Sequence, residues 1–206
     1  MTDRLAAAQT ALNAGHKDEA VEHLIAAVTE DPVRPVPVYR VLTSQLYAAG
    51  RYACIYLAPF DYHRIHVPID AQLRSTRYLP GRLFSVNAAT ARTIPGLFGV
   101  NERVVCEFDT HYGALALVMV GALFVGSIET VYAGEINPPA SRGGAAREIA
   151  AGQGLEFRRG DELGRFNMGS TVVLLWQRTA GEFAPGLAAG VRLRLGQLLA
   201  GSRARS

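Results

Sequence analysis

Short runs of β-branched and other apolar residues, punctuated by glycine, constrain the fold of this chain most. The runs cover residues 104–108, 114–120, 125–132 and 171–176, and the glycines beside them are Gly113, Gly121, Gly126 and Gly134. Apolar runs of this length between glycines are typical of β-strands joined by tight turns. A further short strand is predicted at residues 55–57. We therefore predict an α+β fold dominated by antiparallel sheet, with an α-helical hairpin before it.

The helical prediction concerns the first fifty residues. Residues 2–14 are rich in alanine and end at Gly15, and residues 19–28 form a second helical pattern that stops before Asp31-Pro32. This arrangement resembles one tetratricopeptide unit, and residues 37–49 resemble the start of a second. An ordinary alanine-rich helical hairpin is an equally open interpretation. The predicted division is a tetratricopeptide-like helical segment at 1–50, a β-rich domain at 51–177 and a basic C-terminal tail at 178–206.

Composition limits the alternatives. With 206 residues, 49% hydrophobic and 19% charged, the chain suits one domain with a small appendage and is not disordered. Its two cysteines give neither a disulfide framework nor a zinc pattern and fit a reducing compartment. The charged N-terminus predicts no signal peptide. The longest apolar stretch, residues 114–125, is too short to span a bilayer, so any membrane contact is expected to be peripheral.

The C-terminal tail differs from the N-terminal segment in charge. Residues 177–206 hold five arginines against one glutamate, whereas residues 1–32 are acidic. A basic tail of this kind either lies on an anionic membrane surface or is a solvated terminus. Residues 186–200 predict a short helix rich in leucine and arginine. Residues 201–206 are expected to fray.

Ser170, which follows Gly169 at the start of the apolar run 171–176, is the first candidate for chemistry. A serine in this place can be a nucleophile, because glycine lets its own carbonyl be approached closely and tolerates strained backbone angles. The same dipeptide is also typical of an ordinary turn. Gly126-Ser127 repeats the dipeptide with no base beside it, and we interpret it as structural.

The second candidate is the segment Asp61-Tyr62-His63-Arg64-Ile65-His66, in a predicted loop. His63 and His66 are three residues apart, a spacing that suits zinc, but no cysteine or glutamate at metal-like spacing accompanies them. Loop histidines with structural hydrogen bonds are the other interpretation. Arg64 suits either a phosphate or a surface carboxylate.

Taken in order, several segments resemble the phosphatidylserine decarboxylase proenzymes, a family that makes its own pyruvoyl group. They are residues 61–68, 79–87, 101–105, 125–128 and 160–167, followed by Gly169-Ser170-Thr171. The resemblance covers about residues 53–177. It implies a zymogen that cleaves itself between Gly169 and Ser170, where Ser170 becomes the covalent pyruvoyl cofactor. It further implies decarboxylation of phosphatidylserine to phosphatidylethanolamine, with the pyruvoyl carbonyl as electron sink.

By this resemblance each catalytic residue has a role. Ser170 attacks the carbonyl of Gly169, His66 is the base, His63 serves the decarboxylation step and Asp61 is a supporting carboxylate; no metal is implied. The expected partners are phosphatidylserine and a membrane surface, with no nucleic acid. A homo-oligomer and a partner protein bound by the helical segment are further alternatives. The expected location is the cytoplasmic face of the cell membrane.

The sequence also departs from the family pattern. The family carries a Pro-Ala-Asp-Gly segment upstream, whose aspartate orients the base, and no such segment occurs here. Met168 stands where leucine or valine is usual, and Ala71 falls near a common glycine. Loss of the orienting carboxylate predicts weakened self-cleavage. The alternative hypothesis is therefore a truncated or recombined, catalytically inactive decarboxylase-like domain that acts as a binding or scaffold protein.

Overall fold

The computed structural model describes residues 50–86, 90, 93–123, 125, 127–137, 145–177 and 181–201, together with Ala7, Thr10, Ala11 and Ala14. Within these ranges the chain is β-rich, and its strands form sheets of seven, four and two members with antiparallel ladders. The antiparallel β-rich prediction is confirmed. Ala7, Thr10 and Ala11 are helical, and the rest of the predicted helical hairpin lies outside the described residues.

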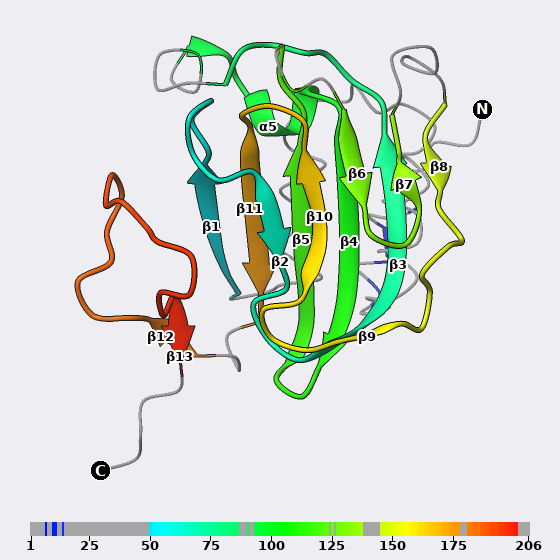
Figure 1. The fold of residues 1–206 in the computed structure, drawn as a ribbon. Coiled ribbons are helices and arrows are strands. Elements are labelled where there is room, and N and C mark those ends of the chain that lie inside the picture. Colours follow the sequence, from blue (N-terminus) through cyan, green and yellow to red (C-terminus); the bar gives the residue numbers. More distant parts are fainter. Residues whose placement is uncertain are drawn as a thin grey trace.

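The seven-stranded sheet forms the broad layer in Figure 1. Its path is β1 (Arg51–Tyr56), β11 (Thr171–Trp176), β5 (Gly113–Val120), β4 (Arg103–Thr110), β3 (Ala71–Leu79) and β8 (Arg147–Glu148), with β9 (Glu156–Phe157) also paired to β3. β5 is an almost continuous apolar run, as expected for a central strand covered on both faces. The edge strand β1 instead alternates between half-buried and exposed side chains.

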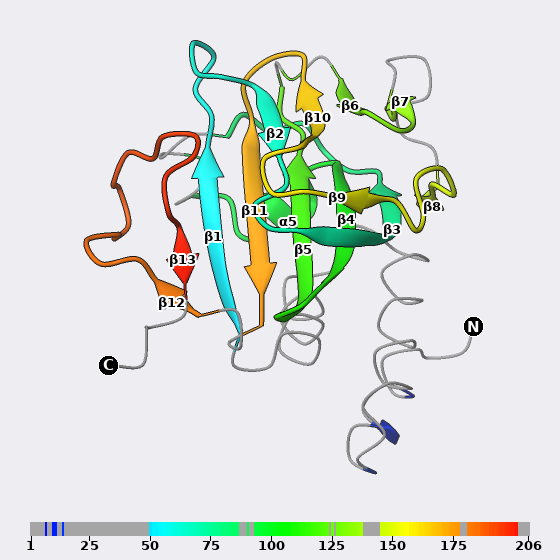
Figure 2. The same ribbon diagram turned by 60° about the horizontal axis from the view of Figure 1, so that its bottom comes forward.

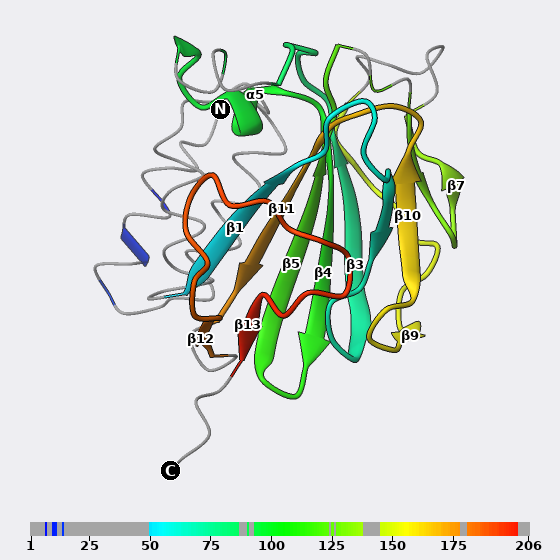
Figure 3. The same cartoon turned by 60° about the vertical axis from the view of Figure 1, so that its left-hand side comes forward.

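The four-stranded sheet lies over one face of this layer (Figures 1 and 3). Its order is β2 (Arg64–His66), β10 (Glu162–Phe166), β6 (Ile128–Thr130) and β7 (Gly134–Glu135). The core between the sheets contains Ile65, Ile128, Leu163 and Phe166 from the smaller sheet and Phe108, Leu117 and Met119 from the larger. Burial of these side chains is the main force that holds the two layers together.

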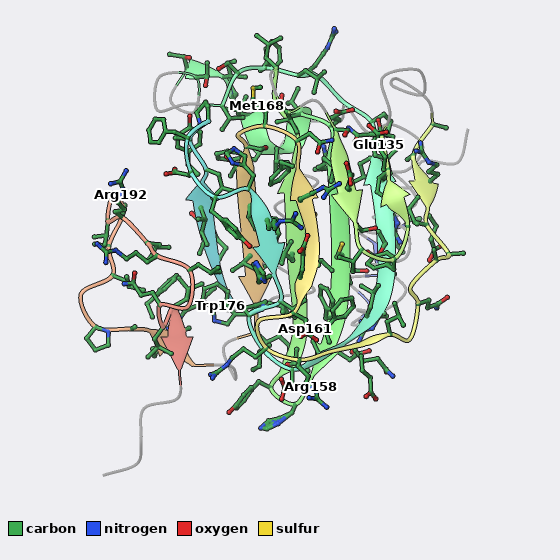
Figure 4. The ribbon with its side chains drawn as sticks, in the orientation of Figure 1. Glu135, Arg158, Asp161, Met168, Trp176 and Arg192 are labelled. Carbon is green, nitrogen blue, oxygen red and sulfur yellow. The ribbon has the colours of Figure 1, made fainter. Side chains whose placement is uncertain are left out.

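The segment 167–170 carries the chain from β10 in the small sheet to β11 in the large one, and we call it the crossing. It lies at the upper end of both sheets in Figure 1, where the β1–β2 connection and the short helix α5 (Leu97–Val100) also lie. Figure 4 places Met168 at this end. The fold therefore brings the predicted cleavage bond to the junction between the two layers.

The C-terminal part contradicts one prediction. Residues 186–200 are not helical; turns at Gly186, Gly190 and Gly196, with φ of 82°, 87° and 81°, interrupt the pattern. Because left-handed backbone ends a right-handed helix, the leucine spacing there does not produce one. Instead β12 (Glu182–Phe183) pairs with β13 (Ala200–Gly201) beside β1, as Figure 2 shows.

The remaining predictions fall partly outside the described residues. Gly201 is the last residue of β13, and 202–206 lie beyond the described part. None of the described helices is long and apolar enough to cross a membrane. The division of the chain at residues 50 and 177 stays a prediction.

Candidate active site

Ser170 is buried between two strands of the large sheet. Its side chain is 1% exposed, and its hydroxyl donates a hydrogen bond to the carbonyl oxygen of Val120 at the end of β5. Its own carbonyl accepts a hydrogen bond from the amide of Leu57, just after β1, at 2.7 Å. Both neighbours of β11 thus hold Ser170. A hydroxyl placed here is shielded from bulk water.

Gly169 is required for close packing and not for an unusual backbone angle. A Cβ built on it would lie 2.9 Å from the carbonyl oxygen of Leu57 and 3.0 Å from the nitrogen of Pro59. Its φ is not in the positive region, so the tolerance of glycine for strained angles is not used here. Close approach to the Gly169 carbonyl itself stays a prediction. Only a residue without a side chain fits against the β1–β2 connection at this point.

Asp61 and His63 lie at the same end of the molecule as Ser170. The Asp61 carboxylate accepts a hydrogen bond from the amide of Ala58 at 2.9 Å and closes a turn over residues 58–61, directly after the Leu57–Pro59 backbone that packs on Gly169. The carbonyl of His63 accepts a hydrogen bond from the amide of Phe166 at 3.1 Å. Within the described part of the chain, the Nε2 atom of His63 is buried without a hydrogen-bond partner. The structure therefore brings three of the predicted residues to one end of β10.

His66 lies at the other end of β10. It pairs across the ladder with Glu162, and its Nδ1 lies 2.7 Å from the carbonyl oxygen of Gly160. Because a carbonyl only accepts, Nδ1 donates in this contact, and Nε2 of the neutral ring then accepts from the Tyr62 hydroxyl at 2.9 Å. The Tyr62 and His66 rings also stack, with 5.7 Å between centroids.

The distance between these two ends is the main departure from the expected contact of a base with the Ser170 hydroxyl. Figure 4 shows Asp161 and Met168 at opposite ends of β10. A strand of five residues such as β10 spans roughly 15 Å at about 3.3 Å per residue. Among the described residues no hydrogen bond joins the ring of either histidine to the Ser170 hydroxyl. The role of His66 as the base of Ser170 stays a prediction, and it requires a rearrangement of this geometry.

Comparison with known proteins decides the family. The sequence profile described as "Phosphatidylserine decarboxylase" matches residues 12–201. The chain is 53% identical over 152 residues to the phosphatidylserine decarboxylase proenzyme of Acidovorax ebreus (strain TPSY), a match that covers 73% of this chain and 53% of the relative. The chain belongs to the phosphatidylserine decarboxylase family.

Other relatives carry the same name. The proenzyme of Methylococcus capsulatus is 45% identical over 160 residues, covering 78% of this chain and 55% of the relative. That of Shewanella putrefaciens is 48% identical over 164 residues, covering 78% of this chain and 57% of the relative. The chain thus spans about half the length of the curated relatives it matches. The family resemblance found in the sequence is confirmed.

The residues around Ser170 fit the pyruvoyl group that the family resemblance implies. A Cβ on Gly169 would clash with the Leu57–Pro59 backbone, and Ser170 is the buried residue directly after it. The Nε2 atom of His63 and the Oγ1 atom of Thr171 are both buried and, within the described residues, have no hydrogen-bond partner. Buried polar atoms of this kind are rare in native proteins and call for a partner that the described residues do not supply.

A buried polar cluster in the family motif 101–105 escaped the sequence analysis. Glu102 is 2% exposed, and its carboxylate accepts hydrogen bonds from the Asn137 amide at 2.6 Å and the Tyr78 hydroxyl at 3.1 Å. The Asn101 side chain donates to the carbonyl of Gly121 at 2.9 Å. Asn137 itself is fully buried.

The cluster holds the backbone of Gly121, through Asn101, and of Ile128, through Asn137. The residues next to these two contact the crossing. The carbonyl of Val120 accepts from the Ser170 hydroxyl, and the carbonyl of Ser127 accepts from the amide of Asn167 at 3.2 Å. The Asn167 side chain also donates to the Ser127 hydroxyl. Ser127 was interpreted as structural, and its contact with the crossing supports that role. The one signal in the sequence was the occurrence of Asn101, Glu102, Ser127 and Asn167 inside the family motifs.

Arg64 pairs with a carboxylate. Its guanidinium lies 2.7 Å and 2.8 Å from the two oxygens of Glu162 on the outer face of the small sheet. Of the two alternatives left open by the sequence, the structure thus shows the surface carboxylate. A neighbouring ion pair joins Arg165 to Glu129 at 2.6 Å.

Proposed function

We propose that this chain is a pyruvoyl-dependent phosphatidylserine decarboxylase that first cleaves its own backbone between Gly169 and Ser170. The observation that carries the proposal is the burial of Ser170 beside a glycine that has no room for a side chain. Membership of the family supports it, since the relatives are named proenzymes of this activity. The pyruvoyl group would derive from Ser170 and would supply a carbonyl electron sink for loss of carbon dioxide.

The proposed self-cleavage needs only the chain and water. The Ser170 oxygen bonds to the Gly169 carbonyl carbon, and the C–N bond of that peptide breaks, which leaves an ester and a free amine. Removal of the Ser170 α-proton then breaks the bond between Cβ and the ester oxygen and releases Gly169 as a carboxylate. Water replaces the nitrogen of residue 170, which leaves as ammonia. The hydroxyl must first turn away from Val120, where it donates in this structure.

Each histidine has a separate proposed task. His66 would accept the Ser170 proton, because a neutral imidazole is the usual base for a weak hydroxyl nucleophile. It would have to leave Tyr62 and Gly160 to do so. His63, at the same end as Ser170, would move a proton at the substrate, and Asp61 would hold the turn that packs on Gly169.

The proposed substrate and location follow from the same activity. Phosphatidylserine is a bilayer lipid, so the protein would work at a membrane surface, and we place it peripherally on the cytoplasmic face. Association into a homo-oligomer belongs to the same proposal. Binding of a partner protein through residues 1–50 is a separate hypothesis about residues mostly outside the described part.

Release of carbon dioxide from phosphatidylserine vesicles tests the activity directly. The full chain should release it and form phosphatidylethanolamine, whereas Ser170→Ala should release none. His66→Ala should block cleavage, while His63→Ala should cleave and then fail to decarboxylate. Activity that survives in Ser170→Ala would refute the pyruvoyl mechanism.

The geometry of His66 favours a second candidate function. Its contacts with Tyr62 and Gly160, at the far end of β10 from Ser170, suit a decarboxylase-like domain that keeps the fold without cleaving itself. Such a domain would act as a binding or scaffold protein. Persistent full-length protein without release of carbon dioxide would support this candidate.

A further inference from the structure

Asn167 is the side chain that ties the crossing to the small sheet. Its backbone amide donates to the carbonyl of Ser127, and its Nδ2 donates to the Ser127 hydroxyl and, at 3.0 Å, to the carboxylate of Glu129. Asn167 and its neighbour Met168 are both exposed, Met168 by 47%. Within the crossing, only Asn167 reaches a charged partner in the described structure.

The partners of Asn167 are well fixed. Ser127 is 1% exposed and directly precedes β6. Glu129 lies within β6 and also accepts from Arg165 at 2.6 Å. The hydrogen bond from Asn167, with support from Arg165, lowers the pKa of Glu129, so the carboxylate stays ionised at neutral pH. Hydrogen bonds to an ionised acceptor are about twice as strong as neutral ones.

The other end of the crossing is held through the backbone. The amide of Leu57 donates to the Ser170 carbonyl at 2.7 Å, and the Leu57–Pro59 backbone packs on Gly169. The Gly169 carbonyl, which the proposed cleavage attacks, therefore lies between a side-chain anchor at Asn167 and a backbone anchor at Ser170. Small displacements of reacting atoms cost large factors in rate. If the side-chain anchor is lost, this end of the crossing keeps only the hydrogen bond from the Asn167 backbone amide to the Ser127 carbonyl.

We propose that Asn167 is a positioning residue, whose donors to Ser127 and Glu129 fix the crossing so that the Gly169 carbonyl stays in reach of the Ser170 hydroxyl. The consequence for cleavage rests on the proposed function. The anchoring itself does not, because it concerns the uncleaved chain.

Three substitutions of Asn167 distinguish a need for its hydrogen-bond donors from a need for the shape of its side chain. Asn167→Asp keeps the shape of the side chain but only accepts hydrogen bonds, and it sets a second carboxylate against Glu129. Asn167→Leu keeps the approximate size and has no polar atom. Asn167→Lys changes the shape but supplies three donors for the same two partners. Arg74→Ala, in an exposed ion pair with Asp109 on β3 and β4, is the matched control.

Hydrogen exchange of the full-length chain tests the anchoring. In Asn167→Asp and Asn167→Leu the amide of Leu57 should exchange about tenfold faster, the change expected for loss of one charge-assisted hydrogen bond. In Asn167→Lys and Arg74→Ala it should exchange at the wild-type rate, and amides of the β3–β4 ladder should not change in any variant. Unchanged exchange of Leu57 in Asn167→Asp would overturn the proposal. So would equal loss of protection in the Asp and Lys variants, which would indicate a role of shape alone.

The rate of self-cleavage in the same variants separates this proposal from the proposed function. Where the wild type cleaves, the Asp and Leu variants should cleave about tenfold more slowly or worse, and Lys should restore the rate. Equal rates in all variants would overturn the positioning role. A wild-type chain that never cleaves would refute the proposed function, and the exchange of Leu57 would still decide whether Asn167 anchors the crossing.

Discussion

The two ends of β10 are held by different kinds of interaction. At the Ser170 end, backbone contacts next to the buried Ser170 fix the geometry: Leu57 bonds to Ser170, and Gly169 packs on the Leu57–Pro59 backbone. At the His66 end, the ring is held through a tyrosine hydroxyl and one carbonyl near the surface. Buried backbone contacts set a position far more firmly than partly exposed side-chain contacts do.

This difference shows which part of the site can move. β2 has three residues and, within the described part of the chain, is an edge strand paired with β10 alone. The register of that ladder shifts between Glu162 and Gly164. A short, irregular edge strand needs little free energy to detach. We therefore expect the Ser170 end to be preformed and the position of His66 at the other end to be able to change.

Gly169→Ala should give the largest effect on stability. Its methyl group would lie 2.9 Å from the Leu57 carbonyl, and backbone on that side cannot shift without disturbing β1. Overpacking of this kind costs about 1–3 kcal/mol of unfolding free energy. Denaturant unfolding measures it, with Met168→Ala in the exposed neighbour as control. A change as small as that of the control would show that the Ser170 end is not rigid.

Glu129→Gln should have a smaller effect that depends on pH. The pKa of Glu129 is lowered by the hydrogen bond from Asn167 and by Arg165, so its ionised form stabilises the fold above the ordinary pKa of 4.5, and this contribution is lost as the pH falls through the lowered value. At pH 7 the variant should lose less than about 1 kcal/mol, because the pair with Arg165 is partly exposed.

Unfolding free energies measured from pH 7 to pH 3 check this prediction. The difference between wild type and Glu129→Gln should shrink steadily below pH 4.5. A difference in unfolding free energy that grows towards acid pH would have the opposite sign to the one expected. It would show that ionised Glu129 does not stabilise the fold.

Tyr62→Phe should give the smallest effect on stability. It removes the Tyr62 hydroxyl, which donates to His66. Tyr62 is 51% exposed. The unfolding free energy should fall by about 0.5 kcal/mol, the low end for one hydrogen bond. If His66 must leave this contact to act, self-cleavage should not become slower. Slower cleavage would show that the Tyr62 contact belongs to the productive arrangement.

Local patterns in the sequence predicted much of the sheet and missed specific parts of it. The apolar runs gave β4, β5 and β11 because each of these strands buries most of its side chains in the core. β3 was missed because Arg74 and Arg77 interrupt its apolar pattern, although it pairs with three other strands. The helix expected at 186–200 failed because leucine spacing does not show that the intervening glycines have positive φ.

The site was predictable as a set of residues and not as an arrangement. The motif order identified Ser170, His63, His66 and Asp61 together, but it did not indicate that β10 separates His66 from the others. That separation depends on strand register, which long-range pairing sets. Burial of Glu102 and Asn137 was likewise hidden, since both are residue types that usually lie at the surface.

Intact mass spectrometry of the purified full chain tests the central claim most directly. The account predicts two fragments, residues 1–169 and residues 170–206, the second lighter by one ammonia than a fragment that begins with serine. Ser170→Ala should give one uncleaved mass. A wild-type chain that keeps the single full-length mass after prolonged incubation under native conditions would contradict the claim that Ser170 breaks the bond to Gly169.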